Sequence, residues 1–250
     1  MITLKSAHEI ELMRTAGKIT AAARALAGEM VKPGVTTKEI DTAVEHFIRK
    51  EGAVPSFKGL YGFPASACIS VNEEIIHGIP SDRVLQEGDI VSVDVGAYIG
   101  GYHGDCAATF ACGKISPEDQ DLIDVTRQSF FEGFNMAREG NRLYDISAAV
   151  QAYVESHGYS VVREFVGHGI GRQVHEAPEV PNFGHPGRGP RLLRGMTIAV
   201  EPMVNAGSAA IRQMSDGWTV KTRDGKNAAH YENTLLITNV EPEILTAPAI

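Results

Sequence analysis

The sequence has 250 residues, enough for one large domain or two small ones with a sizeable hydrophobic core. Charged residues make up 22% and hydrophobic residues 43%, as in ordinary soluble globular proteins. The net charge of -8 and the lack of a Lys/Arg cluster argue against nucleic acid or an anionic membrane as the main ligand.

No apolar run of the chain has the length of a signal peptide or of a membrane span. The three cysteines, Cys68, Cys106 and Cys112, are odd in number and show no paired spacing. We therefore expect free thiols and a cytoplasmic protein. Cys106 beside Asp105 could be read as a metal ligand, but a small residue within a strand is the simpler interpretation.

Two capping boxes predict two helices at the start of the chain. Ser6 with Glu9 begins the first helix, and apolar residues then recur at helical spacing. Thr36 with Glu39 begins the second helix, which we expect to end at Gly52.

Two extended segments follow, at 67–71 and 90–95. The second alternates valines with Ser92 and Asp94, as a strand with one buried face does. Together with the two helices, these segments give the first half the order helix, helix, strand, strand.

The second half repeats that order. Ser116 and Pro117 are typical of an N-cap and a first helical position. The later elements that the pattern predicts are helices at 121–138 and 143–156, strands at 161–166 and 196–200, and a hairpin around 223–226. No Pro/Gly/Ser linker separates the halves, so we expect one domain over 1–250 with an internal duplication, about 6–113 and 114–245.

The duplication places acidic residues at matching positions. The segment 31–52 matches 137–158, and 85–97 matches 192–204, which pairs Asp94 with Glu201. Duplicated halves packed about a pseudo-twofold axis would bring these acids together. Two buried carboxylates repel each other unless a cation lies between them. The repeat therefore predicts a metal site.

Two further acids join the expected cluster. A turn near 99–101 would fold Asp105 back to lie nearly opposite Asp94, where side chains in antiparallel strands are close. Glu232 comes directly before an apolar strand, as Glu201 comes directly after one. Solvated acids on a sheet face are the alternative, and we consider it weaker because four acids meet the same pattern.

Histidines supply the remaining candidates. His168 lies between glycines that allow unusual backbone angles and a close approach. His77 and His175 occur in two short phrases, His-x-Ile-Pro and His-x-x-Pro, that are counterparts in the two halves. Four carboxylates and one imidazole suit two adjacent divalent ions better than one tetrahedral structural zinc. Such a pair of ions favours hydrolysis through a polarised carbonyl.

With these residues in place, the sequence resembles the type I methionine aminopeptidases. The motifs that carry the resemblance run over nearly the whole chain: CISVNEEIIHGIP, GDIVSVDVGAYIGGYHGDCAATF, VGHGIGRQVHEAP, GMTIAVEPM and the late HYENT. The resemblance implies an α+β pita-bread fold, in which two pseudo-symmetric halves surround a curved antiparallel sheet. The short interval between His168 and Glu201 resembles the minimal bacterial form.

The resemblance also implies a role for each residue. The metal ligands would be Asp94, Asp105, His168, Glu201 and Glu232, with Asp105 and Glu232 bridging two divalent ions of cobalt, manganese, iron or zinc. His77 and His175 would contact substrate and stabilise the tetrahedral intermediate, and Glu201 would help to move the proton. The implied reaction removes the initiator methionine from nascent chains at the ribosome when the second residue is small, and the implied state is a monomer.

The methionine pocket departs in part from the family pattern. The residues that match are Phe63, Cys68 and Trp218. The residues that differ are Phe57 at a usual cysteine, Leu60 at a usual tyrosine and Val174 at a usual aromatic position. Because the replacements are apolar, methionine remains a suitable occupant.

Two other functions fit part of the pattern. Prolidase and aminopeptidase P use a similar ligand set, but usually carry an additional N-terminal domain. A pita-bread protein that binds peptides without metal would be a non-enzyme, but the five intact ligand positions argue against it. Cleavage of prolyl peptides and metal analysis, respectively, distinguish these alternatives from a methionine aminopeptidase.

Overall fold

The two capping boxes form as the sequence predicts. The computed structural model of the chain describes residues 1–247. The backbone N–H of Ser6 donates to the carboxylate of Glu9 at 2.9 Å, and that of Thr36 donates to Glu39 at 2.7 Å. Each cap hydroxyl in turn accepts from the backbone N–H of the glutamate. These bonds satisfy donors that a helix start would otherwise leave free.

Four α-helices form in the described residues, in two pairs. They are α1 (Ala7–Met30), α2 (Thr37–Lys50), α3 (Pro117–Met136) and α4 (Leu143–Ser156), with a short 3-10 helix, η1, at Leu60–Gly62. As predicted, Ser116 caps α3 and Pro117 is its first residue. Within residues 1–247, no helix combines the length and apolar character needed to cross a bilayer.

Within residues 1–247, the strands form four antiparallel sheets. The first contains β1 (Val54–Pro55), β2 (Ala67–Val71), β4 (Ile90–Ile99) and β5 (Tyr102–Ala111). The second contains β6 (Ser160–Val161), β10 (Met203–Asn205) and β13 (Ala228–His230), and the third β3 (Glu74–Ile76), β11 (Ile211–Gln213) and β12 (Val220–Thr222). The fourth contains β7 (Gly167–Gly169), β8 (Glu176–Val180), β9 (Thr197–Val200), β14 (Asn233–Leu236) and β15 (Glu243–Ile244).

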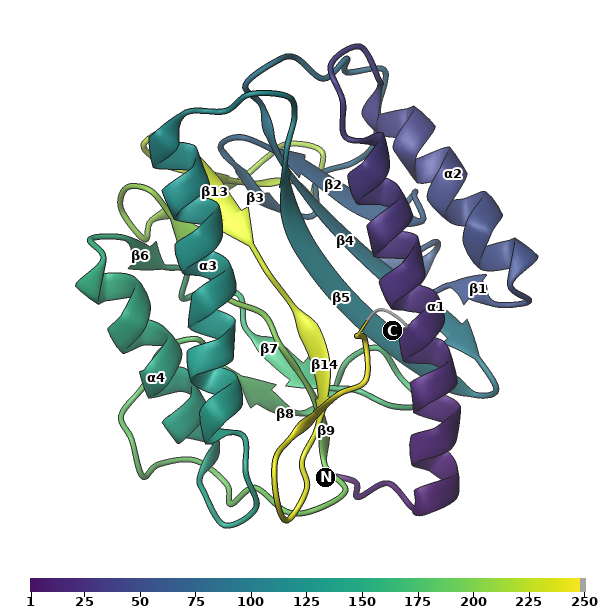
Figure 1. Ribbon diagram of the computed structural model, residues 1–250, viewed down its shortest axis with the longest axis vertical. Helices are drawn as coiled ribbons and strands as arrows, with labels where there is room; N and C mark the ends of the chain where they lie inside the picture. The colour runs from purple at the N-terminus through teal and green to yellow at the C-terminus, as the bar shows by residue number, and fades with distance from the viewer. Residues whose placement is uncertain (248–250) are drawn as a thin grey trace.

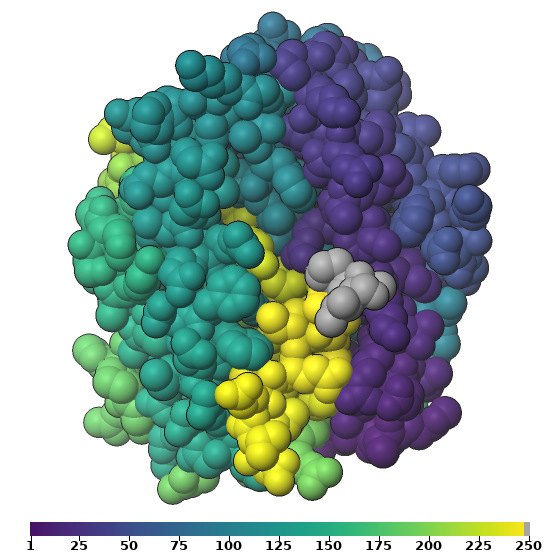
Figure 2. All heavy atoms as spheres, viewed as in Figure 1, coloured from purple at the N-terminus to yellow at the C-terminus, as the bar shows by residue number. Residues whose placement is uncertain are grey.

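The helix pairs cover the strands from one side. Figure 1 shows α1 and α2 in purple and blue on one flank, α3 and α4 in teal on the other, and the yellow β13–β14 segment running between them. In Figure 2 yellow atoms of the C-terminal part of the chain appear at the surface between the two flanks, whereas β13 and β14 themselves are buried. The valines of β4 are fully buried with apolar residues of α1 and α2, such as Ala23 and Ile40, so the helices seal one face of the first sheet.

Helix α1 lies unusually close to β5, because glycines meet at the contact. A Cβ atom at Gly104 would lie 2.9 Å from the Cα of Gly17. Gly104 therefore faces the helix. Because successive strand residues point to opposite faces, Asp105 points away from α1. The contact thus fixes which face of β5 carries the acid.

Two strand predictions are wrong. Of the strand expected at 161–166, only Val161 lies in a strand, at the end of β6. Residues 162–166 lie outside the sheets, and β7 begins directly after them. The turn at 223–226 does not close a hairpin, because β12 pairs with β11 and β3 while β13 pairs with β10. Short buried strands are placed by partners far away in sequence, which turn residues do not reveal. The division into duplicated halves stays a prediction.

We expect Gly104→Ala to lower the free energy of unfolding by about 1–3 kcal/mol, because its Cβ would meet helix backbone that cannot rotate away. The matched control is Gly28→Ala, whose Cβ would lie closest to the side-chain ring of Phe110, which can shift, and which gains helix propensity. Denaturant unfolding of the metal-free variants measures both. Equal losses would contradict the close backbone contact as the cause.

Candidate active site

One cavity of about 330 Å³ gathers all the site residues that the sequence predicts. It lies on the face of β4 and β5 that points away from α1. The predicted residues that line it are Asp94, Asp105, His168, Glu201, Glu232, His77, His175, Phe63, Cys68 and Trp218. Residues from both halves of the chain therefore meet in a single space.

The two aspartates lie on neighbouring strands, but not directly opposite each other. The turn consists of Gly100 and Gly101, both with positive φ, and it pairs Ile99 with Tyr102. This register places Asp94 across from Ala107 and Asp105 across from Gly96. The acids were expected to lie nearly opposite each other, but the two-residue hairpin loop sets a register in which they are diagonal neighbours, two residues apart along the strands. Both side chains still share one face of the sheet.

His168 presents one ring nitrogen to the acids. Its Nδ1–H donates to the carbonyl of Gly169 at 2.9 Å, so Nε2 carries the lone pair. Nε2 lies 3.8 Å from Oδ2 of Asp105 and 3.6 Å from Oε1 of Glu201. A fixed tautomer of this kind is typical of a metal-ligating histidine.

The glycines beside His168 allow close strand packing. A Cβ at Gly167 would collide with the carbonyl of Ala199 on β9, and one at Gly169 with that of Ala177 beside it. Neither glycine has a positive φ. The sequence prediction of a close approach is thus correct, and that of an unusual backbone angle is not.

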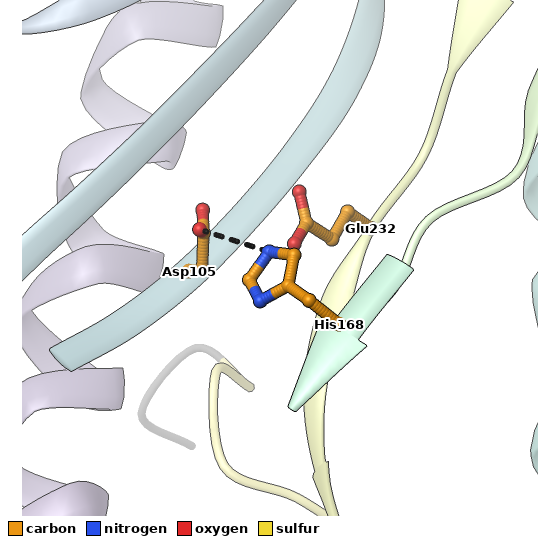
Figure 3. Close-up of side chains that lie close together, drawn as sticks. All are labelled: Asp105, His168 and Glu232. Atoms are coloured by element: carbon orange, nitrogen blue, oxygen red, sulfur yellow. Dashed lines mark ion pairs between the residues drawn. The ribbon is translucent and has the colours of Figure 1, made fainter. Parts of the chain in front are cut away.

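The two glutamates enter the cavity from chain segments next to strand ends. Glu201 follows β9 directly, and Glu232 lies between β13 and β14. Figure 3 shows Asp105, His168 and Glu232 converging from three separate strand segments. Ligand atoms of these three residues all lie within 4.8 Å of one another.

Burial and mutual repulsion oppose ionisation of the acids. Burial raises the pKa of Asp94 to about 7. It also raises the pKa of Asp105 well above its usual range, and the charges of Glu232 and Asp94 add to the effect. The pKa values of Glu201 and Glu232 are raised for the same reasons. Burial lowers the pKa of His168 to about 3, so its contact with Asp105, dashed in Figure 3, brings no positive charge.

The donor set fits divalent cations. Three carboxylate oxygens are buried without a hydrogen-bond partner: Oδ1 of Asp94, Oδ1 of Asp105 and Oε1 of Glu232. Buried polar atoms normally have partners, so unpaired oxygens at one point indicate a missing positive ligand. Oxygen-rich sites with one imidazole suit divalent metal ions.

Two histidines flank this cluster within the cavity. The ring of His175 lies 4.5 Å from the ring of His168, centre to centre, and Tyr61 stacks on it at 5.9 Å. His77 follows β3 with a φ of 58° and packs edge-on against Phe165 and Trp218. Burial lowers the pKa of His77 to about 4 and also lowers the pKa of His175. Both rings are therefore neutral near pH 7 and can donate one N–H each.

An apolar pocket adjoins the polar cluster. Its buried residues are Phe57, Phe63, Ala65, Cys68 and Val174, with Leu60, Ile79 and Trp218 packed against them. Cys68 pairs with Asp94 across β2 and β4, which joins the pocket to the acids. The three residues that depart from the family pattern all belong to this pocket, and all keep it apolar.

Two residues at the site, His230 and Tyr61, were not predicted from the sequence. The exposed fraction of His230 is 2%, and its Nε2 lies 3.7 Å from Oε2 of Glu201 and 3.9 Å from Oε2 of Glu232. Its position two residues before Glu232 places it on the same side of the chain, and this spacing could have revealed it. Tyr61 lines the cavity although 75% of it is exposed. Its φ is positive, and the neighbouring glycines are the only sequence signal of an unusual backbone there.

The family assignment follows from a comparison with known proteins. The model for "Metallopeptidase family M24" matches residues 11–239. The chain belongs to this family. The acids and His168 described above are thus the metal-binding candidates of an M24 metallopeptidase, a family that binds divalent metal.

The similar proteins point to one branch of the M24 family. Methionine aminopeptidase of Clostridium perfringens is 59% identical over 246 residues, covering 98% of this chain and 99% of that protein. The crystal structure of methionine aminopeptidase from Thermotoga maritima superposes with a TM-score of 0.97 at 44% identity, covering 98% and 99% of the two chains. A prolidase from Pyrococcus furiosus shares the fold, with a TM-score of 0.81 and 22% identity, and this chain covers 66% of it. The pita-bread fold predicted from the sequence is confirmed.

We expect metal-free Asp94→Asn to gain stability over metal-free wild type as the pH rises from about 5 to about 8. The folded pKa of Asp94, about 7, lies above its ordinary value of 3.8. The stabilisation from the bound proton is therefore complete below about pH 4 and is lost as the pH rises through 7. Asn does not titrate, so the free energies of unfolding should diverge by a few kcal/mol.

Saturating Mn²⁺ provides the control for this comparison. Wild type should then be the more stable protein, because the cation binds the ionised acid. If the free energy of unfolding of metal-free Asp94→Asn changes with pH as that of metal-free wild type does, the raised pKa of Asp94 is contradicted.

Proposed function

We infer that this chain is a metal-dependent methionyl aminopeptidase, which releases methionine from the N-terminus of peptides. The observation that carries the inference is the direct contact between an apolar pocket and a cluster of four carboxylates and one imidazole whose chemistry suits divalent cations. The similarity to methionine aminopeptidases covers nearly the full length of both proteins and supports the same activity.

The proposed cofactor is a pair of divalent ions per chain, of cobalt, manganese, iron or zinc. Asp94, Asp105, His168, Glu201 and Glu232 would hold them. When bound, such ions supply Lewis-acid chemistry that polarises the peptide carbonyl and activates water. The four raised carboxyl pKa values support a site with several positive charges.

The remaining polar residues would act on the reacting peptide. Glu201 lies at the edge of the cluster and would carry the proton from water to the leaving amine. His175 and His77 are neutral and can donate an N–H to the oxygen that becomes charged during attack and to the scissile amide. Donors that are already in place stabilise the transition state without reorganisation.

The apolar pocket would bind the methionine side chain. Phe63 and Trp218 meet edge to face with ring centres 5.1 Å apart, and Cys68 joins them to the acids. We propose that a peptide is cleaved when its second residue is small, and that the natural substrates are nascent chains at the ribosome. A monomer in the cytoplasm suits such a role.

We expect metal-stripped protein to regain release of free methionine from Met-Ala-Ser when Mn²⁺ or Co²⁺ is added. Ala-Pro peptides should stay intact, because the pocket beside the acids is shaped by apolar groups. Mass spectrometry of both reactions measures the outcome. Cleavage of the prolyl peptide alone would move the function to the prolidase type, and no cleavage of either peptide would indicate a binding protein.

We expect His168→Ala and His175→Ala to fail for different reasons. His168→Ala should lose metal affinity and turnover together, since its Nε2 faces two acids. His175→Ala should keep the metal and lower kcat by about 10²–10³, as the loss of one oxyanion donor does. Metal titration beside steady-state kinetics separates them. Equal losses of metal in the two variants would contradict the role of His175.

A further inference from the structure

The imidazole of His230 lies inside the acidic cluster with no partner of its own. Its Nε2 is buried and makes no hydrogen bond. It lies 3.7 Å from Oε2 of Glu201 and 3.9 Å from Oε2 of Glu232. A nitrogen lone pair and two carboxylate oxygens would face one another as acceptors, which is unfavourable in a buried site. Either a proton or a cation must lie between them.

Glu201 is flanked by two imidazoles. Its Oε1 lies 3.6 Å from His168, and its Oε2 lies 3.7 Å from His230. The two rings differ in whether a hydrogen bond fixes which ring nitrogen carries the proton. The Nδ1–H of His168 is bound by the Gly169 carbonyl, which leaves Nε2 as an acceptor for metal. Within residues 1–247, no such carbonyl holds Nδ1 of His230, so its Nε2 is free to carry the proton.

The backbone of His230 is held firmly in place. The hydroxyl of Thr109 accepts from the N–H of His230 at 2.9 Å and donates to its carbonyl at 2.9 Å. Ser92 lies 2.8 Å from the same hydroxyl and can supply the remaining hydrogen bond. The ring therefore approaches Glu201 from a rigid support, as a positioning residue requires.

We propose that His230 is a positioning residue of the metal centre, whose Nε2–H donates to Oε2 of Glu201. This bond would hold the glutamate so that Oε1 stays beside His168 for metal binding. The proposal rests on the proposed function, since it assigns Glu201 to the metal and to proton transfer. It adds a residue of the second half as a support for a metal ligand. Ligand atoms of Glu201, His230 and Glu232 lie within 4.8 Å of one another, so direct binding of metal by His230 is the competing outcome that the test must separate.

The test compares His230→Leu, which removes the donor, with His230→Gln, which keeps an N–H donor on a side chain of similar reach. Each stripped variant is titrated with Mn²⁺ by calorimetry and with Co²⁺ by visible absorption. We expect Leu to weaken metal affinity by about 10–100-fold and Gln to remain close to wild type, as for other partners of metal ligands. The pH profile of kcat should shift in Leu and not in Gln.

Two further measurements separate positioning from folding. The metal-free Leu variant should unfold at or above the wild-type midpoint, because it leaves no buried donor unpaired. In a Glu201→Gln background, adding His230→Leu should change metal affinity little, because the partner of the hydrogen bond is already altered.

Three results would overturn the proposal. The first is a metal affinity of His230→Leu equal to that of wild type. The second is a metal affinity of His230→Gln as weak as that of His230→Leu. Loss of one metal equivalent in both variants would make His230 a ligand instead. If wild type binds metal but releases no methionine, the proposed function fails, while the metal titrations still decide the role of His230.

Discussion

The structure of this site depends on the repulsion among four carboxylates, two of them buried and two half-buried. Asp94, Asp105, Glu201 and Glu232 meet in one cavity, and each has a raised pKa. Arg24 of α1 relieves part of this field. Its guanidinium donates to the carbonyls of Ala107 and Glu232 from behind the cluster. One half-buried guanidinium cannot balance four acids, so the fold itself creates the need for divalent ions.

The fold resists this repulsion by joining the two halves at the site. The backbones of Ala107 and Glu232 exchange two hydrogen bonds, at 3.0 and 3.3 Å. The hydroxyl of Thr234 accepts from the N–H of Asp105 and donates to its carbonyl. Strand β5 of the first half is thereby fixed to the β13–β14 segment of the second. Side chains held on paired strands keep their positions when a cation binds or leaves.

The close contact of α1 with β5 has a consequence for function. Gly104 allows the helix to approach, and the alternation of the strand then turns Asp105 to the opposite face. The helices therefore seal one side and leave the other for the cavity. The pocket residues that depart from the family pattern lie outside the strands. Phe57 and Leu60 lie between β1 and β2, with Leu60 at the start of η1, and Val174 lies just before β8. Residues outside the strands can be substituted more freely, because their side chains do not set the pairing of the strands.

The sequence alone determined where the helices begin and which chemical groups the candidate site contains. Capping boxes, the N-cap at Ser116 and the glycine turn depend on neighbouring residues, and all form as expected. The repeat predicted a carboxylate cluster before any family resemblance. Only the tertiary structure decided the diagonal step between Asp94 and Asp105, the partners of β12 and β13, and the approach of His230 to Glu201. These features depend on contacts between residues distant in sequence, which no local pattern encodes.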